Sequence, residues 1–338
     1  MQRTLASLAT LALGLLGPAA RAAPPTPGPA TPGPATPGPA TPGPATTSPV
    51  HAVKVTILST MLADQGLGEW GFAALVEVDG KKILYDTGAR PRTVLENARE
   101  LHVELGDVED VILSHFHDDH TTGLATLRRE LAAQNPAALS RVHVGKGIFQ
   151  ERRGKVNPVI AVRKEIEATG ARFIEHDKPA QLLPGVWLTG PIPRANPERN
   201  FPGGVEVLRG TSWIADEVAE DQALVIDAPG GLVVITGCGH AGIVNTVQYA
   251  RTVVRAAPVR AAIGGFHLFN AKPATIDWTA DKLLGFRVAQ ILAAHCTGIE
   301  NTFLLRQRMG RSRQDVAVAS VGATFDLDHG VRTGSIAQ

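Results

Sequence analysis

The stretch Ser114-His115-Phe116-His117-Asp118-Asp119-His120 holds three imidazoles and two carboxylates within a single turn of the chain. It follows the apolar run Val111-Ile112-Leu113 and precedes Thr121-Thr122-Gly123-Leu124. A short apolar run of this kind is typical of a buried strand. We therefore expect a strand that ends at Leu113, a tight loop that presents the polar side chains, and a helix from about Leu124.

The spacing of these side chains predicts a metal site. His115 and His117 lie two residues apart, so they can project from one side of the loop and chelate one ion. Asp119 and His120 lie just beyond and can reach a second ion, as two-metal hydrolytic sites require. Imidazole with carboxylate suits zinc, with iron or manganese as alternatives. Polar loop residues without an ion are the simpler interpretation, but four possible ligands directly after a core strand favour metal.

This H-x-H-x-D-H pattern after a strand resembles the signature of the metallo-β-lactamase fold superfamily, and the resemblance runs from about residue 53 to residue 327. Three further segments narrow it: residues 236–245 (TGCGHAGIVN), 264–268 (GGFHL) and 294–298 (AHCTG). With them the chain looks like the branch of 7,8-dihydropterin-6-yl-methyl-4-(β-D-ribofuranosyl)aminobenzene 5′-phosphate synthase-like metallohydrolases. The resemblance implies an α/β fold, a four-layer αββα sandwich whose ligand loops converge along one rim.

Each ion needs at least one more protein ligand. His240 and His295 are the best candidates, because each follows a predicted buried strand in a superfamily-like setting; a histidine satisfied in the core or on the surface is the alternative for each. His267 follows Gly264-Gly265 in a similar setting. It can be a ligand, but we favour a contact with substrate. We expect Asp119 to bind metal and orient the nucleophile, and His267 to assist the leaving group or oxyanion, so these two are the predicted catalytic residues.

Asp86, at the end of a predicted strand, falls where the superfamily has an aspartate that supports the metal loop by hydrogen bonds. A turn aspartate that caps its own backbone is the alternative. Cys238 stands where many superfamily hydrolases have the aspartate of Thr-Gly-Asp, which bridges the two ions. Its thiolate can bind zinc, or the side chain can simply be buried, and both possibilities stay open. This departure also leaves open whether the second site is filled.

The chain has two cysteines, Cys238 and Cys296, and both lie in the predicted site segments. A disulfide scaffold is therefore not expected, although an oxidised pair stays open. Cys296 follows His295 directly. We do not expect these two to act as a catalytic pair, because neighbours on an extended strand point to opposite faces.

Residues 1–22 have the three parts of a secretory signal: Arg3, an apolar run at 5–16 and Ala-Arg-Ala at 20–22. We expect an exported protein, periplasmic or extracellular, without a stable membrane anchor after cleavage; an ordinary N-terminal helix is the alternative. Residues 23–50 contain Thr-Pro-Gly-Pro-Ala four times, a composition that cannot build a packed core and predicts a disordered linker. The catalytic domain is then expected at residues 51–338.

Within that domain, residues 190–222 are rich in Pro, Gly, Asn and charge, and we expect a long loop over one edge. The acidic side chains in it can meet substrate, but we favour solvated loop charge for each of the four: Glu198, Glu206, Asp216 and Glu217. We expect strands at 53–58, 72–78, 81–85, 108–113, 141–144, 172–174, 186–189, 223–227, 232–236, 260–263 and 290–294, with edge strands at 316–320 and 323–325. We expect helices at 91–101, 124–133, 160–168 and 243–254, and one from about residue 298.

The composition supports a folded enzyme with a small-molecule substrate. Hydrophobic residues make up 44% of the chain and the net charge is +1, without basic runs, so nucleic acid is not an expected partner. The sequence predicts an exported hydrolase in which two divalent ions, zinc being favoured, activate water against a phosphate ester, a phosphodiester, or a cyclic ester or amide. The alternatives are an iron-dependent redox enzyme such as a sulfur dioxygenase, and a non-catalytic binding protein. Oligomeric state and substrate identity are not predicted.

Overall fold

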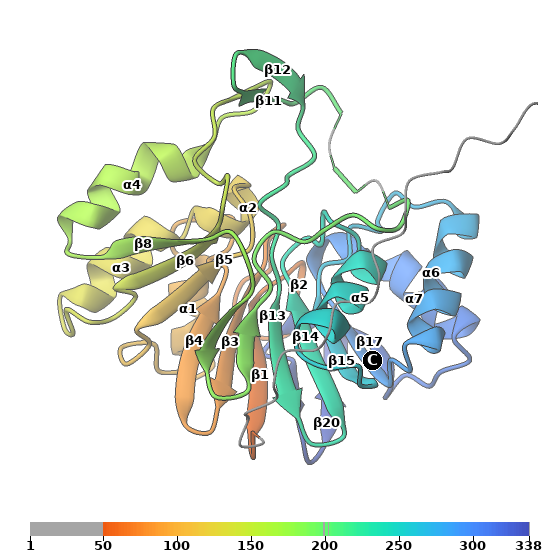
Figure 1. The fold of residues 1–338 in the computed structure, drawn as a ribbon. Helices are drawn as coiled ribbons and strands as arrows, with labels where there is room; N and C mark the ends of the chain where they lie inside the picture. Colours follow the sequence, from red (N-terminus) through yellow and green to blue (C-terminus); the bar gives the residue numbers. More distant parts are fainter. Residues whose placement is uncertain (1–49, 199, 202, 338) are drawn as a thin grey trace, which may run out of the picture. The chain divides into compact units, whose positions relative to one another are not determined.

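The computed structural model describes residues 50–198, 200–201 and 203–337, so the predicted signal segment and nearly all of the predicted linker lie outside it. Two β-sheets face each other, with helices on both outer faces (Figure 1). The predicted αββα sandwich is therefore confirmed. Within the described ranges, no helix has the length and apolar character needed to cross a membrane.

The first sheet has the strand order β20-β19-β1-β3-β4-β5-β6-β8. Strands β3 and β4 form a hairpin through Asp79 and Gly80, whose φ angles of 48° and 79° suit the tight turn predicted there. The strands are β1 (Val53–Ser59), β3 (Ala73–Val78), β4 (Lys81–Tyr85), β5 (Asp110–Leu113), β6 (Arg141–Gly145), β8 (Arg172–His176), β19 (Thr324–Asp326) and β20 (Gly330–Arg332).

The second sheet has the order β17-β16-β15-β14-β13-β10-β9. Strand β14 shows why a parallel strand reads as a continuous apolar run: Val233 and Ile235 face the core between the sheets, while Leu232 and Val234 face the helices. The strands are β9 (Ala180–Leu183), β10 (Val186–Leu188), β13 (Leu224–Ala228), β14 (Gly231–Thr236), β15 (Val259–Gly264), β16 (Gln290–Ala293) and β17 (Val316–Val318).

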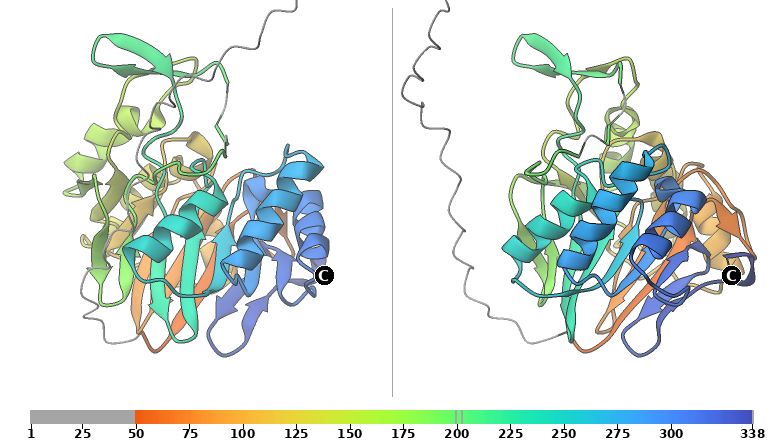
Figure 2. Two further views of the ribbon diagram at one scale, coloured as in Figure 1. Left: turned by 45° about the vertical axis from the view of Figure 1, so that its right-hand side comes forward. Right: turned by 90° about the vertical axis from the view of Figure 1, so that its right-hand side faces the viewer.

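Three helices pack on the outer face of each sheet. On the first sheet these are α1 (Thr93–Glu100), α3 (Leu124–Ala132) and α4 (Pro158–Ala168). On the second sheet they are α5 (Ile243–Val253), α6 (Pro273–Gly285) and α7 (Ile299–Arg308), which lie next to one another in the right-hand view of Figure 2. Several short elements also occur. Strand β2 (Leu62–Ala63) pairs with β18 (Ser320–Val321), and single turns form α2 (Asp118–Thr121), η1 (His295–Thr297) and η2 (Ser335–Ala337).

The parallel strands determine where polar side chains gather. Strands β4, β5, β6 and β8 run parallel in the first sheet, and β14 to β17 run parallel in the second. Asp86 directly follows β4, and the stretch that begins at Ser114 directly follows β5. In the second sheet, the segments with Cys238, His267 and His295 follow β14, β15 and β16. Open α/β sheets bind ligands at the carboxyl ends of their parallel strands, so both sheets contribute to one site.

Residues 190–222 differ from the predicted loop. They contain the hairpin β11 (Glu206–Arg209) and β12 (Ser212–Ala215), which pairs with β7 (Arg152–Arg153) in a third sheet. This hairpin extends beyond the end of the sandwich at which α2 lies (Figure 1). Glu198 and Asp216 are only 9% and 2% exposed, so the prediction that they are solvated was wrong, because protein donors bind both carboxylates. Glu206 and Glu217 do lie at the surface.

Four smaller expectations also need correction. The polar stretch after β5 is a short helix from Asp118 rather than a continuous loop. Residues 323–325 are not at an edge, since β19 lies between β20 and β1. Helix α6 has no counterpart in the sequence interpretation. Val50, assigned to the linker, is buried in the core between the sheets, so the folded unit begins at least one residue earlier than predicted.

Candidate metal centre

Three buried histidines form the first cluster. His115, His117 and His240 each offer one ring nitrogen, and these nitrogens lie within 4.8 Å of one another. His240 Nε2 is 3.2 Å from His117 Nδ1, while the Nε2 atoms of His115 and His117 are buried without a hydrogen-bond partner among the described residues. Burial, followed by neighbouring positive charge, lowers the pKa of all three well below the ordinary value. The rings are therefore neutral, which is the form that binds a metal ion.

Neighbouring groups fix the orientation of these rings. Ser114 Oγ lies 2.9 Å from His115 Nδ1, and the carbonyl oxygen of Asn200 accepts a hydrogen bond from His240 Nδ1. Metal-binding histidines usually use their second nitrogen in this way. Between the two histidines of the loop, Phe116 turns inward and is fully buried. The buried Phe116 side chain thus anchors the loop in the hydrophobic core.

The second cluster has a mixed set of donors: Asp119, His120, Cys238 and His295, with the candidate atoms within 4.8 Å of one another. His120 Nε2 lies 3.1 Å from Cys238 Sγ, and His295 Nε2 lies 3.2 Å from Asp119 Oδ2. Asp119 Oδ1 is buried and has no hydrogen-bond partner among the described residues. An unpartnered buried carboxylate oxygen is costly, and a cation at this position would satisfy it.

The charges of the second cluster differ from those of the first. Burial alone would lower the pKa of His120, but the carboxylates of Asp119 and Asp86 outweigh burial and raise it to about 9. Burial would raise the pKa of Asp119, but His120 and His295 lower it below its usual range. Without a metal ion, His120 therefore holds a proton between two carboxylates. A divalent cation would replace this proton, so the donor set fits a metal ion.

Asp86 contacts both ends of the stretch 114–120, at Ser114 and at His120. Its Oδ1 accepts a hydrogen bond from the Ser114 backbone N–H at 2.7 Å, and its Oδ2 accepts one from Ser114 Oγ at 2.7 Å. The same Oδ2 lies 2.7 Å from His120 Nδ1. The Asp86 side chain is fully buried and accepts no bond from its own turn in the described structure. This placement is that of a supporting carboxylate, as the resemblance implied.

Two backbone features bring the sheets together at the site. A Cβ on Gly237 would lie 2.1 Å from Ser114 Oγ and 2.5 Å from Asp86 Oδ2, so only glycine allows this close approach. Asp86, His267 and His295 have φ angles of 57°, 49° and 45°, a left-handed conformation that costs energy for residues other than glycine. Three of the eight described non-glycine residues with a positive φ thus lie at the strand ends that present the candidate ligands.

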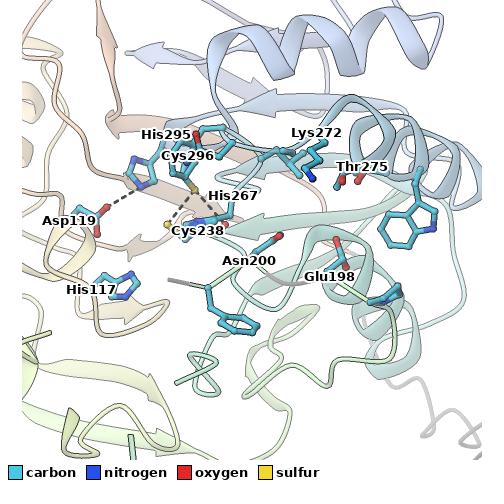
Figure 3. Close-up of a pocket in the computed structure, with 18 of the residues that line it drawn as sticks. His117, Asp119, Glu198, Asn200, Cys238, His267, Lys272, Thr275, His295 and Cys296 are labelled. Atoms are coloured by element: carbon cyan, nitrogen blue, oxygen red, sulfur yellow. Dashed lines mark hydrogen bonds and ion pairs between the residues drawn. The ribbon is translucent and has the colours of Figure 1, made fainter. Parts of the chain in front are cut away.

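A cavity of about 1120 Å³ opens over these clusters, and His117, Asp119, Cys238, His267 and His295 line it (Figure 3). Its walls carry two lysines, Lys155 and Lys272. Aromatic side chains from separate segments form much of the remaining wall: Trp70, Phe201, Phe269 and Trp278. Trp70 packs against both His295 and Phe269, with ring centroids 4.8 and 5.4 Å apart. The clusters are therefore accessible from a cavity large enough for a small molecule.

His267 and Cys296 lie in the same cavity. The His267 ring is 4.5 Å from the His240 ring, between centroids, and its Nδ1 atom has no partner among the described residues. The reason we gave against a Cys296–His295 pair was wrong, because both residues lie in the turn η1 rather than on an extended strand. Cys296 does not pair with His295, however. Its Sγ atom lies 3.3 Å from Cys238 Sγ instead, and burial raises the pKa of the Cys238 thiol.

Sequence reasoning missed the group that holds the metal loop from the side. The Arg152 guanidinium stacks 3.8 Å from the centre of the Phe116 ring and binds Glu220 at 2.8 and 2.9 Å and Asp216 at 2.6 Å, with all three charged side chains buried. No local pattern marks this group, because its members lie up to 68 residues apart. The cavity lysines and aromatics were missed for the same reason.

Comparisons with known proteins agree with this geometry. The family model of the metallo-beta-lactamase superfamily matches residues 71–254. The 7,8-dihydropterin-6-methyl-4-(beta-D-ribofuranosyl)-aminobenzene-5'-phosphate synthase of Methanocaldococcus jannaschii is 30% identical over 272 residues, which cover 75% of this chain and 92% of that protein. An uncharacterized protein of the same organism is 28% identical and covers 70% and 87% of the two chains.

Solved structures show the same fold. Tm1679, described as a metal-dependent hydrolase of the beta-lactamase superfamily, has a TM-score of 0.65 at 24% identity and covers 82% of this chain and 99% of its own. YhfI from Bacillus subtilis has a TM-score of 0.51 at 12% identity, with coverages of 82% and 100%. With its sandwich fold, its matched sequence and its candidate metal ligands, this chain belongs to the metallo-β-lactamase superfamily.

Proposed function

We propose that this protein is an exported hydrolase that uses two divalent metal ions, with zinc preferred, to cleave a phosphate ester or phosphodiester. The observation that carries the proposal is the pair of ligand clusters at one end of the cavity, with buried nitrogen and oxygen atoms that no described residue satisfies. The pattern of residues 1–22 supports export.

Each cluster would hold one ion. His115, His117 and His240 would bind the first, and Asp119, His120, Cys238 and His295 the second. Ions there would acidify water and neutralise charge that develops on the substrate. Three imidazoles, and imidazoles with a thiolate and a carboxylate, are donor sets that zinc accepts. The thiolate favours zinc over manganese, which prefers oxygen ligands.

The residues of the chain would do the rest of the work. Asp119 lines the cavity, and the carboxylate oxygen that does not bind the ion can accept a hydrogen bond from the attacking water and so orient it. His267 also lines the cavity, so its ring can donate a proton to the leaving oxygen or stabilise negative charge. Trp70 and Phe269 pack edge to face at the cavity wall, and both remain partly exposed there.

Two features favour a phosphate over a neutral ester or amide. Lys155 and Lys272 line the cavity, and cationic side chains recognise phosphate. The aromatic wall suits a planar ring. The name of the relative from M. jannaschii includes both a pterin ring and a ribofuranosyl phosphate. We therefore propose an aromatic or heterocyclic phosphate as the substrate class, and a lactone or lactam as the second choice.

The experiment has two steps. Metal content and the optical spectrum of the purified protein come first, because a colourless protein with two zinc ions supports a hydrolase, whereas ferric iron absorbs visible light and would support the redox alternative. A panel of aryl phosphomonoesters, phosphodiesters, lactones and lactams follows. Turnover of a lactam or lactone alone would reject the proposed phosphate, and a protein that binds metal without any turnover would support a binding protein.

Lys272 offers a sharper test of the phosphate. We expect Lys272→Ala to raise KM for an aryl phosphate by about tenfold, because one charge-assisted hydrogen bond is lost, and to leave KM for a neutral lactone unchanged. Lys164→Ala is the matched control, since Lys164 lies on α4, is exposed and is not among the cavity-lining residues described. Equal effects of the two substitutions would contradict a phosphate contact at Lys272.

A further inference from the structure

Two buried thiols face each other beside the second cluster. Cys238 follows β14 and Cys296 lies in η1, and both are free, with exposed fractions of 2% and 1%. Their Sγ atoms are 3.3 Å apart, and Cys296 Sγ also lies 3.5 Å from the Cys238 carbonyl oxygen (Figure 3). They are the two cysteines of the chain, brought together across 58 residues.

The backbone around them leaves room for this contact. A Cβ on Gly265 would lie 2.7 Å from Cys296 Sγ and 3.4 Å from the Cys238 Cα. Gly265 also donates a backbone hydrogen bond to the Gly237 carbonyl at 2.9 Å, so the strand ends of β14 and β15 stay close. The absence of a side chain at 265 is what allows the Cys296 sulfur to reach Cys238. The two thiols therefore meet just beyond the neighbouring ends of the parallel strands β14, β15 and β16.

Cys238 has a second neighbour. Its Sγ lies 3.1 Å from His120 Nε2 and belongs to the same set of candidate ligands as Asp119 and His295. The first cluster, in contrast, contains no thiol. Cys238 also forms a third group of candidate ligands with His240 and His267. Its sulfur therefore has two kinds of possible partner, a metal ion in either group and the thiol of Cys296.

We propose that Cys238 and Cys296 are a redox modification site that forms a disulfide and thereby removes Cys238 from the second metal cluster. An S–S bond of about 2.05 Å requires each sulfur to move by only about 0.6 Å. The oxidant we propose is a small hydroperoxide, because both thiols line the cavity but are nearly closed to larger molecules. One thiol is oxidised to a sulfenic acid while the hydroperoxide ROOH is reduced to ROH. The other thiol then attacks that sulfur and expels water.

The consequence for metal binding rests on the proposed function. A disulfide sulfur does not bind zinc as a thiolate does, so the oxidised second cluster keeps only Asp119, His120 and His295. The first cluster, His115, His117 and His240, keeps its full set of donors. We expect oxidation to weaken zinc binding in the second cluster, because one of its four donors is lost, and to leave the affinity of the first cluster unchanged. Conversely, zinc in the second cluster occupies Cys238 and protects it from oxidation.

The first experiment uses reduced, metal-free full-length protein and hydrogen peroxide, with no substrate. We expect both free thiols to disappear and the mass of the monomer to fall by two hydrogen atoms, with a peptide that joins residues 238 and 296 in a non-reducing digest. Cys296→Ser is the matched control: its Cys238 should gain oxygen and form no cross-link. Two thiols that persist, separate sulfinic acids, or a disulfide between chains would each overturn the proposal.

The second experiment titrates zinc into the oxidised and reduced proteins. We expect the second zinc ion to bind more weakly to the oxidised protein than to the reduced protein, and a thiol reductant to restore the tighter binding. Zinc at about 100 times its second dissociation constant should slow the loss of thiols by about 100-fold, because only the ion-free fraction reacts. A second dissociation constant that is the same in the oxidised and reduced proteins would overturn the effect on metal binding. A protein that binds no zinc in either state would instead contradict the proposed hydrolase, and the thiol result would stand by itself.

Discussion

Two histidine-rich regions share strand β5 but differ in what satisfies their ring nitrogens. At the carboxyl end of β5, His115 and His117 each leave an Nε2 atom unpartnered. At its amino end, Asp110 Oδ1 lies 2.9 Å from His143 Nε2, and His143 Nδ1 lies 2.9 Å from His176 Nε2. The rings of His143 and His176 stack with centroids 5.2 Å apart.

The difference separates a candidate ligand cluster from a structural one. Both ring nitrogens of His143 contact protein partners, so an ion could bind either nitrogen only by displacing its partner. Arg141 further occupies the Asp110 carboxylate at 2.6 and 2.7 Å. Histidines in the loop after β5 instead have donors that only an ion or water can satisfy. Proximity of histidines is therefore a weaker sign of a metal site than unpartnered nitrogen atoms.

The largest expected effect comes from removing a ligand. His117→Ala should abolish binding of the first ion and lower kcat/KM by at least about 100-fold, because even residues that merely orient a ligand change metal affinity or activity by about 10- to 100-fold. Metal content by mass spectrometry and turnover of the best substrate from the panel measure both losses.

His143→Ala is the matched control for that substitution, since His143 is also a buried histidine and lies in strand β6 of the first sheet. It should keep the metal content of the wild type. Full activity in His117→Ala, or equal metal loss in the two variants, would end the distinction between the two regions.

A smaller effect is expected from the aspartates that contact histidines in each region. Asp86→Asn should weaken zinc binding at the second cluster by about 10- to 100-fold, because the amide cannot support both Ser114 and His120 as the carboxylate does. Competition with a chelator of known affinity measures this change.

Asp110→Asn makes the same chemical change beside His143 and should leave zinc affinity as it is. An Asp86→Asn protein with the zinc affinity of the wild type would show that Asp86 supports the fold and not the ligands.

The smallest effect concerns pH. Burial, followed by the neighbouring His143, lowers the pKa of His176 to about 4, against about 6.5 in an unfolded chain. Between these values the unfolded chain binds a proton that the folded chain does not, so this residue makes stability fall as the pH decreases from 6.5 to 4. His176→Gln should lose less stability over this window than the wild type. Urea unfolding of the metal-free proteins at pH 7 and pH 5 measures the difference, and identical losses would rule out this contribution.

The parts of this structure that depend on local pattern were predictable. The β-branched runs predicted the principal strands, and Asp79-Gly80 predicted a hairpin. The predicted strand ends indicated where His240 and His295 lie. Residues that depend on distant partners were not. Glu198 and Asp216 were expected in solvent because their sequence neighbours are polar, yet each is bound by groups far along the chain.

The same limit applies to the site. Nothing near Arg152 in sequence shows that its guanidinium stacks on Phe116, and nothing near Cys296 shows that its sulfur meets Cys238. The predicted orientation of His295 and Cys296 was wrong for a local reason. Residue 295 adopts a positive φ, which turns the chain where an extended strand was expected. The candidate ligands and the support from Asp86 could be inferred from the sequence and its resemblance, whereas the contacts of Arg152 and Cys296 required the tertiary structure.

The central claim is tested most directly by anomalous diffraction at the zinc edge from crystals of the reduced protein grown with zinc. We predict two peaks, one among His115, His117 and His240 and one among Asp119, His120, Cys238 and His295. A map without peaks at these clusters, or with zinc between His143 and His176 instead, would contradict the account.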